Sequence, residues 1–215
     1  MNYERGLLNN QTITNFKSWG KHFLICFKSF AVRIHFLLFG SYRINETKDS
    51  IPRLSFTFKK GQLNFYACSV KIVEQPIDEI YDWEADVMNP LWDSKNAEAK
   101  LNNKKDEIIC DALLDQNIFA GVGNIIKNEI LFRIKVPPES KIGSLPANKI
   151  ESVITEAVKY SFEFLEWEKA FVLKKHWLAH NKKICTRDNI PFIKKKLGKT
   201  NRRSFYCIKC QKLYN

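Results

Sequence analysis

The apolar positions of the chain follow two different spacings. Between residues 11 and 75 they come in short runs rich in β-branched and aromatic side chains, which predict β-strands; the runs are FLICF, AVRIHFLLF, RLSFTF and LNFYACSVKIV. Turn residues Lys59-Lys60-Gly61-Gln62 lie between the last two runs, so RLSFTFKKGQLNFYA predicts a β-hairpin. Four or five such strands favour an antiparallel sandwich or barrel.

In the second half the spacing becomes helical. DEIICDALLDQ and NIIKNEILFRI each predict a helix with one buried face, and Pro137-Pro138 ends the second one. ANKIESVITEAVKYSFEFLEWEK predicts a longer amphipathic helix, whose apolar side carries Ile150, Val153, Ile154, Ala157, Val158 and Phe162. The polar stretch from Asp78 to Lys105 predicts a short helix and then a linker, with a domain boundary near residues 95 to 106.

A glycine pair separates the first two predicted helices. FAGVGN predicts a tight turn that leads directly into a helix, with Asn124 as its N-cap. The backbone N–H groups of such a turn, together with the helix dipole, can hold a phosphate. Because most Gly-x-Gly pairs mark ordinary turns, the neighbouring residues decide how this one is interpreted.

The composition is that of a globular protein. A chain of 215 residues with 45% hydrophobic content can bury a core, in one large or two modest domains. Lys28, Arg33 and His35 interrupt the most apolar segment, which argues against a membrane span or a signal peptide and for a cytoplasmic protein. Single cysteines at 26, 68 and 110 are expected to be buried thiols.

The positive charge lies at one end of the chain. The net charge is +12, and residues 169 to 215 alone carry fourteen Lys or Arg and one acid, a local +13. Such a block can be a solvated or disordered arm. Here it is interleaved with Trp177, Phe192, Phe205 and Tyr206, which favours a folded phosphate-binding surface.

Three cysteines in the basic tail have metal-ligand spacing. Cys207 and Cys210 form a C-x-x-C pair, and Cys185 precedes them, with Asp188 where the partner of Cys185 is expected. A structural zinc held there would fix a hairpin too small to bury a core of its own. The fourth ligand is open between Asp188, His180 and His176, because a carboxylate is a legitimate zinc ligand; folding without metal is the alternative.

Three stretches resemble one known family. LLDQNIFAGVGNIIKNEILFRI is similar to the helix-two-turn-helix signature of the formamidopyrimidine-DNA glycosylase and endonuclease VIII family, and KKKLGKTNRRSFYCIKCQK to its C-terminal zinc finger. WGKHFLICF and RIHFLLFGSYRI resemble its Lys-bearing strand and its His-x-x-hydrophobic-x-Gly loop. The resemblance implies an α+β fold, with an antiparallel β-sandwich over residues 1–95 that lacks its N-terminal helix, a helix-two-turn-helix domain over 106–180 and a zinc-finger β-hairpin over 181–215.

The resemblance also assigns roles by position. It implies that Lys21 contacts DNA beside the lesion, that Asn124 and Arg202, with Arg203 as an auxiliary, bind phosphates, and that Leu38 and Phe39 enter the duplex. An apolar wedge there would replace stacking lost when a base is flipped out. The alternatives are a surface lysine for Lys21, a helix cap for Asn124, and core packing in an apolar strand for Leu38 and Phe39.

The first residues depart from the family. Its enzymes begin with Pro-Glu, whose proline amine attacks the sugar C1′ to give a Schiff base, whereas this sequence begins Met1-Asn2-Tyr3-Glu4-Arg5. No catalytic residue is therefore assigned; the α-amine of Met1 and the side chain of Lys21 are unplaced or unactivated amines, and Glu4 is expected to be a surface acid. We expect a misassigned start that omits a few dozen residues, or else a shortened chain without catalysis.

Three functions remain as hypotheses. The first is a base-excision repair glycosylase with abasic-site lyase activity, acting as a zinc-containing monomer on damaged or abasic double-stranded DNA in a bacterial-type nucleoid. The second is a non-catalytic relative that binds damaged DNA. The third is a zinc-ribbon protein that binds RNA, which leaves FAGVGN and the strand-rich half unexplained.

Overall fold

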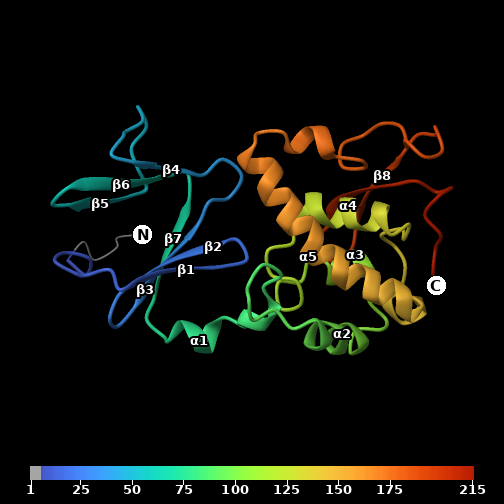
Figure 1. Cartoon of the computed structure of the whole chain (residues 1–215), viewed down its shortest axis with the longest axis horizontal. Coiled ribbons are helices and arrows are strands. Elements are labelled where there is room, and N and C mark those ends of the chain that lie inside the picture. The colour runs from blue at the N-terminus through green and yellow to red at the C-terminus, as the bar shows by residue number, and fades with distance from the viewer. Residues whose placement is uncertain (1–5) are drawn as a thin grey trace. The chain divides into compact units, whose positions relative to one another are not determined.

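The computed structural model describes residues 6–215, so Met1 and Glu4 lie outside the described residues. The chain divides into two compact units, one ending at Asp82 and the other running from Trp83 to Asn215. We call them the N-terminal unit and the C-terminal unit; Figure 1 shows the elements of each. The division falls after Asp82, earlier in the chain than the boundary expected near residues 95 to 106.

The N-terminal unit is a β-sandwich, as predicted. Its described strands form two antiparallel sheets of order β1-β2-β3-β7 and β4-β6-β5. The strands are β1 Asn15–Trp19, β2 His22–Cys26, β3 Ala31–His35, β4 Ser41–Ile44, β5 Leu54–Phe58, β6 Gly61–Tyr66 and β7 Ser69–Val73, followed by the short helix α1, Ile77–Ile80. Apolar side chains of both sheets share one buried cluster, which includes Ile25, Val32, Ile34, Phe56 and Phe65.

Three of the strand predictions need comment. The β5–β6 hairpin is confirmed, with Phe58 paired to Gly61 across a two-residue turn. The run LNFYACSVKIV was predicted as one strand but forms two, β6 and β7, because Ala67 adopts a φ of +48° between them. The run AVRIHFLLF ends as a strand at His35, since the turn that follows places Leu37 at a φ of +54°.

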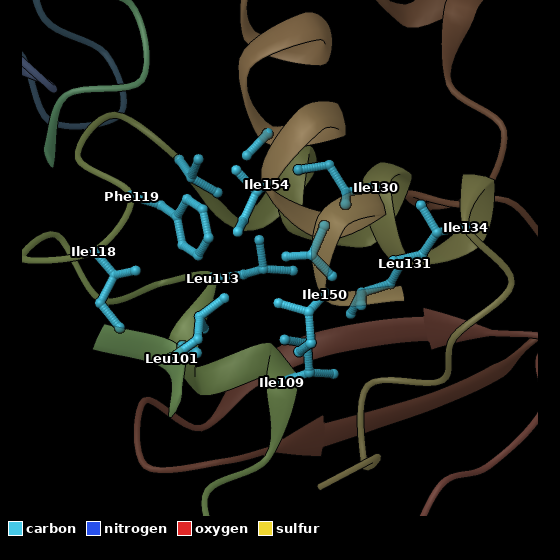
Figure 2. Packing of buried hydrophobic residues seen from close by; sticks show 14 of the residues in the cluster. Leu101, Ile109, Leu113, Ile118, Phe119, Ile130, Leu131, Ile134, Ile150 and Ile154 are labelled. Carbon is cyan, nitrogen blue, oxygen red and sulfur yellow. The ribbon is translucent and has the colours of Figure 1, made fainter. Parts of the chain in front are cut away.

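The C-terminal unit is mainly helical and ends in a hairpin. Its helices are α2 Ser94–Asn102, α3 Ile109–Ala112, α4 Asn124–Arg133 and α5 Ala147–Lys169, with the 3-10 turns Trp83–Ala85, Ile142–Ser144 and Leu173–His176. Strands β8 Ile193–Leu197 and β9 Arg202–Tyr206 pair antiparallel, which confirms the predicted hairpin. Figure 2 shows the core of this unit, where Leu113, Phe119 and Ile130 point toward Ile150 and Ile154 of α5. None of the helices in the described residues has the length and apolar character needed to cross a membrane.

The long helix α5 has the predicted bounds, but its buried face differs at one end. Val153, Ala157, Tyr160 and Ser161 are buried, whereas Phe162 is 48% exposed. Positions 153, 157, 160 and 161 follow the 3.6-residue repeat, and residue 162 is about 100° further round the helix. The expectation that Phe162 belongs to the core side was therefore wrong.

The structure also differs from two predictions for the segment that precedes α4. DEIICDALLDQ is α-helical only over α3, Ile109–Ala112, because turns replace the helix from Leu113 onward. The expected linker contains α2, which begins at the N-cap Asp93, whose carboxylate accepts the N–H groups of Lys95 and Asn96. The polar composition of this stretch concealed two apolar residues, Ala97 and Leu101, which lie four apart and are both buried.

The burial of Leu101 in the core of the C-terminal unit gives a stability prediction. Leu101 is 0% exposed, so Leu101→Ala should lower the free energy of unfolding by about 2–5 kcal/mol through lost burial and the cavity left behind. Leu91→Ala, at a position 62% exposed, is the control and should change it by less than about 0.5 kcal/mol. Denaturant unfolding of both variants measures this; equal effects would show that α2 is not part of the core.

Candidate nucleic-acid interface and metal centre

Two consecutive turns connect α3 to α4. The N–H of Leu114 donates to the carbonyl of Asp111, and the N–H of Ile118 donates to the carbonyl of Asp115. Gln116 then fastens the second turn, because its Oε1 accepts from the N–H of Gly121, which lies at a φ of +98°. The segment is thus a short helix, two turns and a helix, held by hydrogen bonds within it.

The second helix of this arrangement begins one residue earlier than its expected cap implies. Gly123 is the N-cap of α4, and Asn124 is its first helical residue, so the prediction that Asn124 caps the helix was wrong. The side chain of Asn124 instead donates through Nδ2 to the carbonyl of Arg203, at 3.1 Å. Its Oδ1 is buried and, within residues 6–215, has no hydrogen-bond partner.

Two further side chains of α4 bind the same part of β9. Lys127 is 1% exposed, and its Nζ donates to Oγ of Ser204 at 2.7 Å and approaches the carbonyl of Arg203 at 3.4 Å. Asn128 donates through Nδ2 to the Arg203 carbonyl and accepts the N–H of Phe205 through Oδ1. Burial lowers the pKa of Lys127 to about 8, with a smaller contribution from the charge of Arg202.

We refer to Asn124, Lys127, Asn128, Arg203 and Ser204 together as the α4–β9 junction. Donors from the first two turns of α4 converge on one main-chain carbonyl, so the position of β9 against the helix N-terminus is fixed. The side chains of Arg202 and Arg203 are exposed. The junction therefore holds two arginines of the hairpin in a set position relative to the N–H groups at the start of α4.

The tip of the hairpin is anchored as well. The N–H of Lys199 donates to both carboxylate oxygens of Asp111 in α3, at 2.9 and 3.1 Å. Gly198 lies at a φ of +70°, and a Cβ there would meet the Asp111 carboxylate. Glycine is therefore required at this close approach, and the hairpin is attached to the helices at both ends.

A buried glutamate of α4 fixes the segment that leads into the hairpin. Glu129 is 0% exposed, and its carboxylate accepts the N–H groups of Leu178, Ala179 and His180 at 2.7–3.0 Å. The ring of His180 lies edge-on to that of Phe205, 5.3 Å between centroids. Burial, with the nearby charge of Lys127, lowers the pKa of His180 to about 4.

The predicted metal ligands come together beneath the hairpin. Ligand atoms of Cys185, Asp188, Cys207 and Cys210 all lie within 4.8 Å of one another. The sulfurs of Cys185 and Cys210 are 3.8 Å apart, and Oδ2 of Asp188 lies 3.1 Å from the Cys207 sulfur and 3.6 Å from that of Cys185. We refer to these four residues as the Cys3Asp cluster.

These distances fit one tetrahedral metal ion. Zinc–sulfur bonds of about 2.3 Å place two thiolates about 3.8 Å apart, and a thiolate and a carboxylate oxygen about 3.5 Å apart. The cysteines are free thiols in this structure, and a sulfur separation of 3.8 Å is far beyond the bond length of a disulfide, about 2.05 Å. The donor set is thus three thiolates and a carboxylate.

The histidines considered as the fourth ligand are engaged elsewhere. His176 stacks on Trp167 with 4.2 Å between ring centroids, and Nδ1 of His180 lies 3.5 Å from the side chain of Asn128. Among the residues that the structure describes, the group able to hold a metal includes Asp188 and neither histidine. Of the three groups considered as the fourth donor, Asp188 is the one that lies beside the cysteines.

Two side chains connect the cluster to the end of α4. Arg187 donates to the carbonyl of Phe132 at 2.7 Å and to the Cys210 sulfur at 3.8 Å. Gln211 accepts the N–H of Cys207 and donates to the carbonyl of Val136. The loop that carries the cluster is thus attached to the C-terminal end of α4. Strand β9 is attached to the N-terminal end of α4 through the α4–β9 junction.

The N-terminal unit contributes the other predicted DNA contacts. Lys21 is exposed in the β1–β2 turn, immediately before β2. Leu38 and Phe39 are 83% and 86% exposed in the turn after β3, so the alternative that they pack in a core is wrong. All three side chains are accessible within this unit, and their roles in binding stay predictions.

Several residues that build the site carried no prediction from the sequence: Lys127, Asn128, Glu129, Arg187 and Gln211. A signal was present for three of them. Lys127, Asn128 and Glu129 interrupt the apolar run NIIKNEILF at positions that a short, fully packed helix must bury, and buried polar groups need partners. For Arg187 no pattern distinguishes it from the other cations of the tail.

Comparisons with known proteins agree with this geometry. Residues 86–171 match the formamidopyrimidine-DNA glycosylase H2TH domain. The chain is 30% identical over 216 residues to endonuclease 8-like 3 of Bos taurus, covering 96% of this chain and 36% of the bovine protein. It is 28% identical over 144 residues to the DNA-(apurinic or apyrimidinic site) lyase Nei2 of Mycolicibacterium smegmatis, covering 64% and 57% of the two chains.

Solved structures share the fold at lower identity. The Lactococcus lactis formamidopyrimidine-DNA glycosylase bound to DNA with an abasic site has a TM-score of 0.81 at 20% identity, covering 96% of this chain and 84% of that one. A viral DNA glycosylase has a TM-score of 0.79 at 21% identity, with 94% and 86% covered.

A β-sandwich, a helix-two-turn-helix segment and a C-terminal hairpin above a cysteine cluster define an α+β protein of the type represented by these relatives. The chain belongs to the formamidopyrimidine-DNA glycosylase and endonuclease VIII family. It spans about a third of the length of the endonuclease 8-like 3 proteins that it matches.

The Cys3Asp cluster predicts metal binding. Purified protein should contain about one divalent metal ion per chain, and Cys207→Ser should contain little, since three thiolates supply most of the affinity. Asp188→Ala should lose metal to a chelator faster than wild type, and Asp188→Cys more slowly. Elemental analysis and chelator competition measure both, with Cys68→Ala, whose thiol lies in the N-terminal unit, as the control. Equal metal release from wild type and Asp188→Ala would exclude the carboxylate as a ligand.

The environment of His180 predicts a pH dependence of stability. Its pKa is about 4 in the folded chain and about 6.5 when unfolded, so the unfolded chain binds the extra proton. His180 should therefore stabilise the fold fully above pH 6.5 and lose that contribution as the pH falls toward 4, by at most about 3 kcal/mol. Denaturant unfolding between pH 7 and 4 should show a shallower loss for His180→Gln than for wild type. Parallel curves would contradict the assignment.

Proposed function

We propose that this protein binds damaged double-stranded DNA and acts in base-excision repair, as a DNA glycosylase with abasic-site lyase activity. The observation that carries this proposal is the α4–β9 junction, which ties the exposed Arg202 and Arg203 to the N-terminus of a helix that follows a glycine-containing double turn. Helix N-termini and arginines both bind phosphate, and here they are rigidly coupled.

The charge on the hairpin supports a polyanionic partner. Lys196 pairs with Arg203 across the two strands, and Lys194 lies two residues earlier on the same face of β8; all three are exposed. Lys195, on the other face, is paired with Glu139 at 2.7 Å. Like charges directly opposite each other destabilise a sheet, so this arrangement costs stability unless an anion is bound. Duplex DNA offers one negative charge per about 1.7 Å of its axis, a density that suits such a row of cations.

The names of the relatives suggest abasic-site DNA as the ligand and lyase chemistry as the activity. One is a DNA-(apurinic or apyrimidinic site) lyase, and a structural neighbour is bound to DNA that contains an abasic site. By analogy, Leu38 and Phe39 fill the space left by an extruded nucleotide, for which their 83% and 86% exposure suits them. Lys21 binds the backbone beside the lesion.

The chemical step of this proposal needs an amine. Attack of an amine on the sugar C1′ expels the damaged base and forms an imine, which then permits elimination of the 3′ phosphate. We assign DNA binding and positioning to the described residues and assign the attacking amine to none of them. Lys21, the lysine considered for this role, is exposed in a turn and is given a binding role only.

Zinc is the metal that the Cys3Asp cluster suits best. Thiolate ligands in a tetrahedral set favour zinc, and the carboxylate oxygen completes the set. The ion would have a structural role, holding the loops of Cys185 and Cys207 together under the hairpin so that Arg202 and Arg203 keep their position. Arg187, which contacts the Cys210 sulfur, would offset part of the negative charge of the ligands.

The proposal is tested on oligonucleotides that differ only in the lesion. A duplex with an abasic site should bind more tightly than the intact duplex and than single-stranded RNA, and borohydride should trap a covalent adduct with the abasic duplex. Tight binding without an adduct or strand cleavage would indicate the second hypothesis, a non-catalytic protein that recognises damaged DNA. Preference for RNA would overturn the proposal.

The same assay tests the phosphate contacts. Arg202→Ala and Asn124→Ala should each weaken binding to every duplex about equally. Arg202→Ala should also lower the slope of log affinity against log salt by roughly one unit, whereas Asn124→Ala should leave the slope unchanged because asparagine is uncharged. Lys169→Ala, at an exposed lysine of α5 paired with Glu166, is the charge-matched control. A loss confined to one sequence or lesion would contradict a phosphate role.

A further inference from the structure

The C-terminal end of α5 presents an unusual phenylalanine. Phe171 follows the C-cap residue Ala170 and is 95% exposed, the highest value among the large apolar side chains of the described residues. Its φ is +57°, a conformation usually supplied by Gly or Asn because the Cβ of other residues disfavours it. Neither packing nor backbone preference accounts for a phenyl ring at this position.

The ring projects from an ordered turn. The N–H of Val172 donates to the carbonyl of Trp167 at 2.9 Å, which closes the end of α5. The next residue, Leu173, is buried, and the indole of Trp167 stacks on His176 with the ring planes 2° apart. Phe171 is therefore held between two anchored points, which keeps the ring exposed.

The charged side chains that follow Phe171 in the chain are all positive as far as Arg187. From Lys169 to Arg187 the chain contains six Lys or Arg and no acid. Lys174 and Lys175 are exposed in the 3-10 turn just after Phe171. The preceding helical turn carries two exposed acids, Glu166, which is paired with Lys169 at 2.8 Å, and Glu168. An exposed aromatic ring beside cations is the combination that binds single-stranded nucleic acid.

We propose that Phe171 stacks on an unpaired nucleobase, while Lys174 and Lys175 bind the neighbouring phosphates. An unpaired base is the occupant that fits, because the faces of a paired base are covered by its neighbours in the duplex, whereas a single ring can stack on any base that is free. The proposal rests on the proposed function insofar as the ligand is DNA. It uses neither the α4–β9 junction nor the Cys3Asp cluster.

A parallel exists in the N-terminal unit. Leu37 also combines a positive φ, +54°, with high exposure, 62%, and it precedes the predicted wedge residues Leu38 and Phe39. Backbone strain at an exposed apolar tip is retained where the tip has a role, since the strain costs free energy in the free protein.

The test compares Phe171→Gly with wild type on a short single-stranded oligodeoxythymidylate and on a fully paired duplex, by fluorescence anisotropy at fixed salt. Glycine removes the ring and relieves the positive φ, so the melting temperature should stay equal or rise. Affinity for the single strand should fall at least about fivefold, and affinity for the paired duplex should not change. Phe171→Trp should keep the single-strand affinity.

Two control variants separate stacking from general effects. Phe162→Ala removes a half-exposed phenyl ring from the same helix and should leave both affinities unchanged. Lys174→Ala and Lys175→Ala should each lower the single-strand salt slope by about 0.7. If Phe171→Gly binds the single strand within twofold of wild type, the inference is overturned, and the ring would then serve contact with another protein.

The repair function and the stacking role of Phe171 are overturned by different results. Wild-type protein that shows no preference for the abasic duplex and forms no borohydride adduct would overturn the repair assignment, whatever the single-strand result. A wild-type preference for the abasic duplex together with an unaffected Phe171→Gly variant would overturn only the stacking role.

Discussion

The carbonyl of Arg203 organises the C-terminal unit. It accepts hydrogen bonds from Asn124 and Asn128 and lies 3.4 Å from the buried ammonium group of Lys127. These donors lie on α4, where leaving them unpaired away from water would cost several kcal/mol. The main chain of β9 and the hydroxyl of Ser204 supply partners for all three side chains, so the need to pair buried polar groups helps to fix where the hairpin lies on the helix.

The remaining attachments of the hairpin follow the same physical logic. Asp111 accepts the N–H at its tip, Gln211 joins the cluster loop to the end of α4, and Glu129 holds the entering segment. The hairpin buries few apolar side chains of its own, as its outward strand β8 is almost entirely exposed. Polar attachments and a metal-type cluster therefore add to the small buried cluster that Phe132 of α4 forms with Ala179, Cys185, Phe192 and Cys207.

The most exposed of the large apolar side chains in the described residues lie outside the strands and helices. Leu38, Phe39 and Phe171 are the clearest cases; Leu38 follows Leu37, which has a positive φ, and Phe171 has a positive φ itself. A turn can present one ring far from the core without exposing a strand edge or a helix face, which limits the aggregation hazard of an apolar surface. The cost is backbone strain, which persists only because the flanking residues are anchored.

The sequence by itself determined the elements that repeat regularly and the groups whose spacing is local. Helical period gave the bounds of α5, runs of β-branched and aromatic residues around a turn predicted the β5–β6 hairpin, and the C-x-x-C spacing identified Cys207 and Cys210. The tertiary structure decided what depends on distant partners: that Asp188 completes the cluster, that Lys127 and Asn128 bind β9, that α2 packs through Leu101, and that α3 is a single turn. Those partners are 19 to 77 positions away in several cases, and a polar residue shows no local pattern that tells whether its partner is water or a strand far along the chain.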